Sequence, residues 1–175
     1  ADKDKLKKLA PEQKYKELTI EALEEVYGAI EGSGERILII ADDVVNDVKK
    51  NVGVEKMLCK MMMNRRHICG QSDDGEGCGL SMWMTTQVFN KLPRALRATA
   101  DYYIVFKSSN KKELETLFDE VILLQKEEFE EMLKYVFKDK FNFLLIDTNE
   151  DYRNMYHKNL NKRLIFRHME DEEDE

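Results

Sequence analysis

The chain has 175 residues, of which 36% are charged and 42% hydrophobic, so its composition is that of a soluble globular domain with its own core. No apolar run approaches the roughly 20 residues of a membrane-spanning helix, and no apolar stretch of the signal-peptide kind follows the charged N-terminus. Three cysteines without the spacing of a disulfide framework indicate a reducing compartment.

The net charge of −7 is concentrated at the C-terminus. Residues 170–175 are all acidic, and the rest of the chain is close to neutral, so it can carry basic patches. The simplest interpretation of residues 170–175 is a disordered, solubilising tail on a single domain that spans residues 1–169. A docking segment for a basic partner and a DNA mimic are the alternatives.

The first predicted elements follow a lysine-rich segment, residues 1–14. Thr19 can cap a helix whose apolar residues recur at helical spacing up to Ile30. The segment 32–34, Gly-Ser-Gly, ends this helix. The unbroken aliphatic run that follows predicts a strand over 36–41 that is buried on both faces, as in a parallel sheet.

Helical and strand patterns alternate along the rest of the chain. A methionine-rich helix over 54–68 is expected to serve core or subunit packing, because methionine is a flexible apolar filler. Strands that alternate with helices predict an α/β fold, a mostly parallel sheet flanked by helices. The other predicted elements are strands over 80–86, 100–107 and 142–147, a loop over 71–79, and helices over 92–100, 111–124 and 126–138.

Two adjacent acids, Asp42 and Asp43, directly follow the first predicted strand. In open α/β sheets, ligands bind beyond the carboxyl ends of such strands. Two neighbouring carboxylates repel each other unless a cation binds them, and Mg²⁺ prefers oxygen ligands and is shared with substrate phosphates. The alternative is structural, because acids also cap helix N-termini, and residues 36–44 alone favour neither interpretation.

Further polar segments follow these acids in a characteristic order. Arg66-His67 ends the methionine-rich helix, Thr86-Gln87 ends the second strand, and Arg97 completes a Pro-x-x-x-Arg segment before the third strand. With these motifs the chain resembles the DNA-packaging ATPases of the large nucleocytoplasmic DNA viruses, the poxvirus-type branch of the FtsK–HerA superfamily. The resemblance implies a P-loop NTPase core of RecA-like type, of which this chain holds the C-terminal part.

The resemblance extends over about residues 35–124 and more loosely to the end of the chain. It implies that Asp42 holds Mg²⁺ through the water shell of the ion and that Asp43 polarises the water that attacks ATP. It also implies that Gln87 is the polar sensor of the neighbouring strand, because an amide can donate to the γ-phosphate and accept from the water.

Arg66, Arg94 and Arg97 are the candidates for stabilising the charge of the transferred phosphoryl group, an effect of roughly 10³–10⁵ on the rate. The sequence does not assign any of them to its own site or to that of a neighbouring subunit. Their alternatives are structural: Arg97 could pair with Asp101 on a helix surface, and Gln87 could simply end a strand.

The phosphate-binding motif G-x-x-x-x-G-K-[ST] is absent from the sequence, and in this family it precedes the strand that ends in the two acids. We therefore expect residues 1–169 to be a partial ATPase domain that binds ATP poorly and hydrolyses it negligibly by itself. A fragment of a longer protein, half of a split gene product and a degenerate paralogue are all compatible with this pattern.

The implied cofactors are Mg²⁺ and ATP. The implied partners are double-stranded DNA, further copies of the chain in a homo-oligomeric ring, and a viral capsid or portal component, with no membrane. The implied location is the viral factory in the host cytoplasm, or the virion. The alternative function is a non-catalytic scaffold, derived from an NTPase, that docks through its methionine-rich helix and acidic tail.

Two other features carry weaker interpretations. The cysteines, together with His67, lack the paired spacing of zinc ligands, so buried small hydrophobes are the expectation for them. The basic and aromatic segment 152–163 suits contacts to a nucleic-acid backbone. A helix that covers the sheet, followed by a short strand over 164–166, is the favoured prediction for this region.

Overall fold

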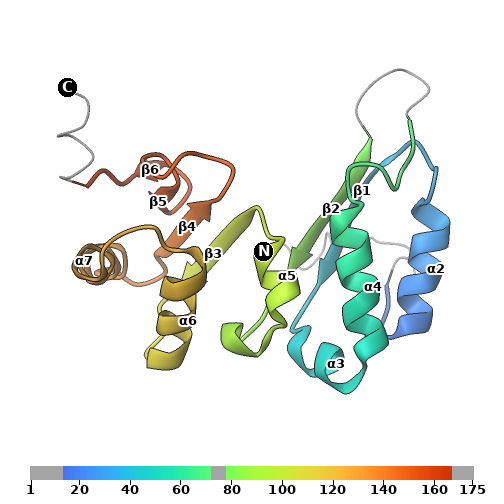
Figure 1. The fold of residues 1–175 in the computed structure, drawn as a ribbon, viewed down its shortest axis with the longest axis horizontal. Helices are drawn as coiled ribbons and strands as arrows, with labels where there is room; N and C mark the ends of the chain where they lie inside the picture. The colour runs from blue at the N-terminus through green and yellow to red at the C-terminus, as the bar shows by residue number, and fades with distance from the viewer. Residues whose placement is uncertain (1–13, 72–77, 167–175) are drawn as a thin grey trace. The chain divides into compact units, whose positions relative to one another are not determined.

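The structure, a computed structural model, describes residues 14–71 and 78–166. Figure 1 shows the order of its helices and strands along the chain. The chain, for which the sequence predicts one domain, divides into two compact units, residues 1–96 and 97–175. Within the described ranges, no helix has the length and apolarity needed to cross a membrane. The acidic segment 170–175 and most of the loop predicted over 71–79 lie outside the described residues.

Two capped helices form one layer of the N-terminal unit. Helix α2 (Ile20–Ile30) begins at Thr19, whose hydroxyl accepts a hydrogen bond from the Ala22 amide at 3.2 Å, as the sequence predicts. Helix α4 (Val52–Met63) begins at Asn51, whose side chain accepts from the Gly53 amide at 2.8 Å. The two helices pack against each other.

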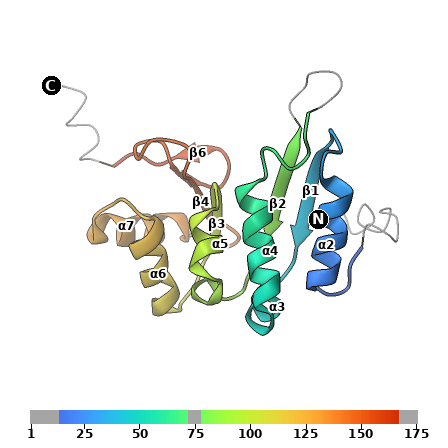
Figure 2. The same ribbon diagram turned by 45° about the vertical axis from the view of Figure 1, so that its right-hand side comes forward.

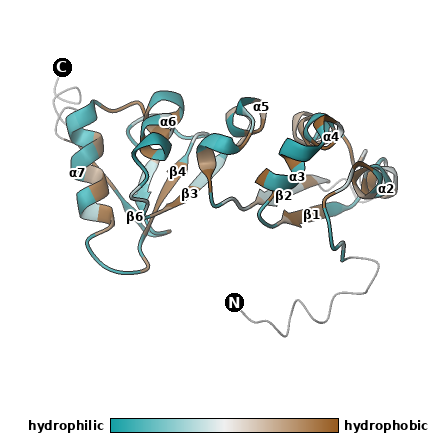
Figure 3. Cartoon of the chain, turned by 90° about the horizontal axis from the view of Figure 1, so that it is seen from below, coloured by the Kyte–Doolittle hydropathy of each residue, from teal (hydrophilic) through white to brown (hydrophobic). Residues whose placement is uncertain are grey.

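Strands β1 (Arg36–Ala41) and β2 (Gly79–Met84) form a two-stranded parallel sheet. Figure 3 shows α2 and α4 on the same side of this sheet. On that side, Ile37, Ile39, Met82 and Met84 pack against the buried core. The parallel register of β1 with β2, from Arg36 opposite Gly79 to Ala41 opposite Met84, confirms the two predicted strands and their parallel pairing.

The prediction that the first strand is buried on both faces is wrong for the described residues. Leu38, Ile40 and Trp83 point to the other face and are 57%, 58% and 55% exposed. The reason is that, within residues 14–71 and 78–96, every helix that packs on the sheet lies on its opposite face. Uncovered apolar side chains on a parallel sheet are unusual, because such sheets normally have both faces covered.

The methionine-rich helix has the packing role that its sequence predicts. Met61 is fully buried and Met62 is 5% exposed, whereas Met63 at the end of α4 is 66% exposed. A short helix that the sequence analysis does not predict, α3 (Val45–Lys50), precedes α4 and packs on it.

The C-terminal unit is built on an antiparallel sheet covered by two helices. Leu144, Ile146 and Tyr156 are fully buried in its core. The elements of the unit are β3 (Tyr102–Phe106), α6 (Lys111–Val121), α7 (Lys126–Val136), β4 (Phe143–Asp147), β5 (Tyr156–Lys158) and β6 (Lys162–Arg163). The strands lie in the sheet in the order β3, β4, β5, β6.

The α/β class is confirmed, but the described strands do not form one mostly parallel sheet. The reason lies in the connection between β3 and β4. A single crossover helix returns the chain to the start of the first strand and gives a parallel pair. Here two consecutive helices intervene, and the chain re-enters the sheet where β3 ended, because Phe143 pairs with Phe106.

The predicted C-terminal covering helix is wrong, and a hairpin of β5 and β6 takes its place. Asn159 lies in the turn with a φ of 58°, a left-handed conformation that asparagine tolerates well. Its amide donates to the Phe143 carbonyl at 2.9 Å and its side-chain oxygen accepts from the Phe143 amide at 3.1 Å. These bonds tie the turn to β4 and favour a hairpin over a helix. The strand predicted over 164–166 is also not formed.

Candidate active site at the carboxyl ends of strands β1 and β2

Asp42 and Asp43 lie between the end of β1 and the start of α3, beyond the carboxyl ends of the parallel strands. Figure 2 shows the connection from β1 to α3. Asp43 has a φ of 52°, in the left-handed region that residues other than glycine rarely adopt. Aspartate tolerates this conformation better than most residues. Backbone strain of this kind clusters at functional sites, so the turn at Asp43 is a candidate site.

Thr85, the residue that follows β2, joins the two acids. Its amide donates to the Ala41 carbonyl at 2.9 Å, and its carbonyl accepts from the Val44 amide at 3.3 Å. Its hydroxyl donates to Oδ1 of Asp42 and accepts from the Asp43 amide at 3.0 Å. One side chain therefore orients the first carboxylate and holds the strained turn of the second.

Gln87 completes the cluster. Its Nε2 atom lies 3.5 Å from Oδ2 of Asp43, at the outer limit of a hydrogen bond. The structure thus brings together three of the predicted site residues, Asp42, Asp43 and Gln87. Thr85 is a fourth member of the cluster that its sequence context did not predict. The signal that could have found it is a hydroxyl directly after the strand that pairs with the acid-bearing strand.

The alternative in which the two acids cap the following helix is wrong. Helix α3 has Val44 as its N-cap, and no side chain makes a capping hydrogen bond to it. Asp42 is exposed and Asp43 is half-buried, so both carboxylates can meet a ligand from solvent.

The donor set of this cluster fits Mg²⁺. Asp42, Asp43 and Thr85 offer carboxylate and hydroxyl oxygens, and Mg²⁺ usually binds through one or two carboxylates while it keeps several waters. Within residues 14–71 and 78–166, no group of three or more His, Cys, Asp or Glu side chains is arranged to hold a metal ion, and this cluster offers two carboxylates and a hydroxyl. Cys69 is fully buried, and burial raises the pKa of its thiol, as for a small core hydrophobe.

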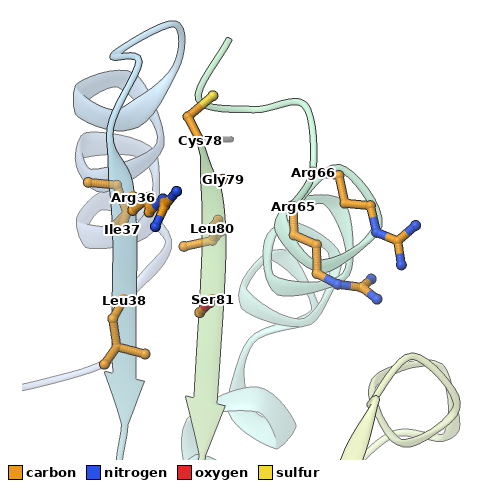
Figure 4. A pocket seen from close by; sticks show the side chains of 9 residues that line it. All are labelled: Arg36, Ile37, Leu38, Arg65, Arg66, Cys78, Gly79, Leu80 and Ser81. Atoms are coloured by element: carbon orange, nitrogen blue, oxygen red, sulfur yellow. The ribbon is translucent and has the colours of Figure 1, made fainter. Parts of the chain in front are cut away.

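Arg66 lies at the opposite end of the strand pair from the acids. It follows Arg65, whose carbonyl accepts from the Leu80 amide at 2.8 Å near the start of β2. At roughly 3.3 Å per strand residue, Arg66 is on the order of 15–20 Å from Asp42. Arg36, Arg65 and Arg66 line a pocket of about 400 Å³. Figure 4 shows Arg65 and Arg66 beside β2, with Arg36 on β1.

Arg97 belongs to the C-terminal unit, and its guanidinium forms an ion pair there. It lies in α5 (Arg94–Ala98) and is only 8% exposed. Its Nε and Nη2 atoms donate to the two carboxylate oxygens of Glu120 at 2.6 and 2.5 Å. Tyr103 donates its hydroxyl to the Arg97 carbonyl at 2.5 Å. The guanidinium of Arg97 is therefore paired with Glu120 of α6, 23 residues away along the chain.

The fold and the site define an α/β protein with a pair of carboxylates at the carboxyl ends of two parallel strands. Comparison with protein-family models, with curated protein sequences and with solved structures gives no match. The features of this chain that bear on its function are the geometry of the cluster and the order of its sequence motifs.

Replacing Thr85 with valine is expected to lower the free energy of unfolding by about 0.5–1.5 kcal/mol, measured by urea denaturation. Valine keeps the shape of the side chain but leaves the Asp43 amide without its acceptor. Ser81→Ala, in strand β2 that Thr85 follows, is the matched control, because within the described chain its hydroxyl makes no hydrogen bond. Equal effects of the two substitutions would contradict the bridging role of Thr85.

Proposed function

We propose that this chain is the metal- and water-positioning part of an ATP-driven motor that moves double-stranded viral DNA into a capsid. The observation that carries this proposal is the cluster of Asp42, Asp43, Thr85 and Gln87 beyond the carboxyl ends of two parallel strands. Ligands of α/β sheets bind at that edge. The order of the motifs resembles that of packaging ATPases of FtsK–HerA type with a RecA-like core. This resemblance is the reason for proposing ATP as the substrate and double-stranded DNA as the partner.

Each side chain of the cluster has a task that fits its position. Asp42 would bind Mg²⁺, which when bound neutralises charge on the phosphates of ATP. Asp43 would accept a hydrogen bond from the attacking water and so orient it. Gln87, close to Asp43, would donate to the γ-phosphate while its carbonyl oxygen accepts from the same water. Thr85 would keep both carboxylates in place.

The sheet of the N-terminal unit has room for a phosphate-binding strand. Its parallel sheet has only two described strands, and Leu38, Ile40 and Trp83 are more than half exposed on one face. A strand followed by G-x-x-x-x-G-K-[ST] and a helix would extend the sheet and cover that face. It would also bring phosphate-binding amides to the edge where the acids lie. The sequence lacks this motif, so we assign it to a segment outside the present 175 residues.

Trp83 is the single tryptophan of the chain and reports on this face. In the purified chain we expect the red-shifted, acrylamide-quenchable emission of a solvated indole. In a longer polypeptide that contains the phosphate-binding segment, we expect a blue shift and protection from quenching, because that segment covers the ring. Identical emission and quenching in the two proteins would contradict the proposed completion of the sheet.

Arg66 is the arginine that we assign to the site of a neighbouring subunit. Its distance from Asp42 keeps it away from phosphates bound in its own chain. Arg36 and Arg65 line the same pocket, and this local positive charge suits a phosphate presented by another copy in a ring. An arginine supplied from a neighbour can stabilise the transferred phosphoryl group. Arg97 is a weaker candidate, because its guanidinium is paired with Glu120.

The test of the proposed function begins with the reading frame upstream of Ala1 in the source genome. A strand followed by G-x-x-x-x-G-K-[ST] is expected there, or in a neighbouring gene, and the product that carries it is expected to hydrolyse ATP only with Mg²⁺. A longer or reconstituted protein that has the motif and shows no Mg²⁺-dependent hydrolysis would overturn the proposal.

A second candidate is the non-catalytic scaffold. The exposed face formed by Leu38, Ile40 and Trp83 favours it, because contiguous apolar surface marks interaction sites. If no phosphate-binding segment accompanies the chain, a partner protein that covers this face becomes the better explanation. The same Trp83 blue shift would then occur on binding that partner, without any hydrolysis of ATP.

A further inference from the structure

Two lysines of the C-terminal hairpin converge on one aromatic ring of α7. Nζ of Lys158 lies 4.8 Å, and Nζ of Lys162 lies 5.2 Å, from the centroid of the Tyr135 ring. Lys158 also donates to the Tyr135 carbonyl at 3.4 Å. The tyrosine is 42% exposed. Cation–π attraction holds both ammonium groups near the ring but leaves their positive charge in place.

The same two lysines are direct cross-strand neighbours in the pairing of β5 with β6. Like charges in that position destabilise a sheet. Lys158 has a partial counter-charge, since its Nζ lies 3.6 Å from Oδ2 of Asp139, a carboxylate that is 69% exposed. For Lys162, no carboxylate within residues 14–71 and 78–166 lies at ion-pair distance. Two converging ammonium groups with so little neutralisation suit an anionic ligand.

The turn after α7 adds a third lysine and an unusual aromatic residue. Lys162 beside the phenol, together with the positive charges of Lys158 and Lys138, lowers the pKa of Tyr135. Phe141, in the same turn as Lys138, is 93% exposed and has a φ of 66°. A bulky residue rarely adopts this conformation, and an aromatic side chain so exposed is available for stacking.

We propose that Lys138, Lys158 and Lys162, gathered around Tyr135, form a surface that binds the phosphodiester backbone of nucleic acid, with Phe141 at its edge able to stack on an unpaired base. The choice of DNA as the ligand rests on the proposed function, whereas the surface stands on its own contacts. Lysines bind backbone phosphates electrostatically and independently of the base sequence, as a translocating motor requires. An anionic membrane is the less favoured ligand, because the lysines surround a phenol ring rather than flank an extended apolar face.

The test measures binding of the intact chain to a labelled random-sequence DNA duplex and to a single strand of equal length. Fluorescence anisotropy is recorded over a range of KCl concentrations, without nucleotide or Mg²⁺. The double variant K158Q/K162Q is expected to reduce the slope of log K against log[salt] by about 1.8, since each phosphate contact contributes roughly 0.9. Phe141→Ala is expected to weaken single-strand binding more than duplex binding.

The matched control is K111Q/K112Q, which removes the same charge from the first turn of α6. It is expected to leave the slope unchanged, and circular dichroism melting establishes that each variant is folded. If K158Q/K162Q does not fold, the single variant K162Q, at an exposed position, is expected to lower the slope by about 0.9.

Three results would overturn the inference. The first is that the chain does not bind DNA. The second is that K158Q/K162Q and the control lose the same amount of salt slope. The third is that K158Q/K162Q still binds DNA but no longer binds phosphatidylserine vesicles, which the unmodified chain binds. Because the assay contains no nucleotide, its failure contradicts the lysine surface and not the active site. Conversely, absent ATP hydrolysis in the longer protein contradicts the active site and leaves the DNA-binding result standing.

Discussion

Replacing Asp43 with asparagine is expected to lower the rate of Mg²⁺-dependent ATP hydrolysis by about 10²–10⁴-fold in a protein that contains this chain and a phosphate-binding segment. Asparagine tolerates the left-handed conformation at this position at least as well as aspartate, so the turn is retained. The substitution removes the negative charge that polarises the attacking water in the proposed site. Steady-state hydrolysis is measured together with the affinity for ATP, which is expected to change little.

The matched control for this variant is Asp47→Asn, which removes the same charge from the first turn of α3. We expect its rate to stay within a few-fold of the unmodified protein, because no hydrogen bond links Asp47 to the cluster within the described residues. A D43N protein that hydrolyses ATP as fast as this control would remove Asp43 from the mechanism. Loss of ATP binding in D43N would instead give Asp43 a role in holding the metal ion.

Replacing Arg97 with alanine is expected to lower the free energy of unfolding by about 2–4 kcal/mol. Loss of one partner from a fully buried ion pair costs roughly 3–5 kcal/mol, because the other charge is left without compensation. The expected loss is smaller than that for a fully buried pair because this pair is partly solvated. The Glu120 side chain is 22% exposed and the Arg97 side chain is 9% exposed. The bidentate geometry, with distances of 2.6 and 2.5 Å, makes the pair strong for its degree of burial.

Arg94→Ala provides the control for this prediction, because Arg94 lies in the same helix, α5, and is exposed. Urea denaturation of R97A, E120A and the double variant is expected to give a coupling free energy between about 0.5 and 3 kcal/mol. No coupling, or equal losses of unfolding free energy in R97A and R94A, would contradict the stabilising role of the ion pair and make Arg97 a candidate for catalysis again. Any effect of R97A on ATP hydrolysis has to be separated from this loss of stability.

Local signals in the sequence were sufficient where one element decides the outcome. Thr19 caps α2 as predicted, because the bond from the Ala22 amide needs only residues three positions apart. Periodicity and residue type likewise predicted the strand before Asp42 and the parallel strand before Gln87. They also predicted that Met61 and Met62 pack in the core. The approach of Gln87 to Asp43 followed from the rule that parallel strands end at one edge.

Long-range contacts could not be predicted in the same way. Thr85 and Asp42 are 43 residues apart, and only the register of β1 with β2 sets their hydroxyl–carboxylate bond. The ion pair of Arg97 with Glu120 spans 23 residues, whereas helical spacing pointed to a partner only four residues away. The hairpin at Asn159 formed in place of a helix because its side chain bonds to β4, a contact that no local propensity contains.

The sequence by itself determined the α/β class, most of the helices and strands, and the pair of acids after β1, because these depend on periodicity, caps and neighbouring residues. Tertiary structure alone decided which residues share a site. It placed Thr85 between the acids and set Arg66 at the far end of the strands. It also paired Arg97 with Glu120 and gathered Lys158 and Lys162 on Tyr135. Each of these contacts depends on strand register or helix packing between distant segments, and a one-dimensional pattern does not encode that information locally.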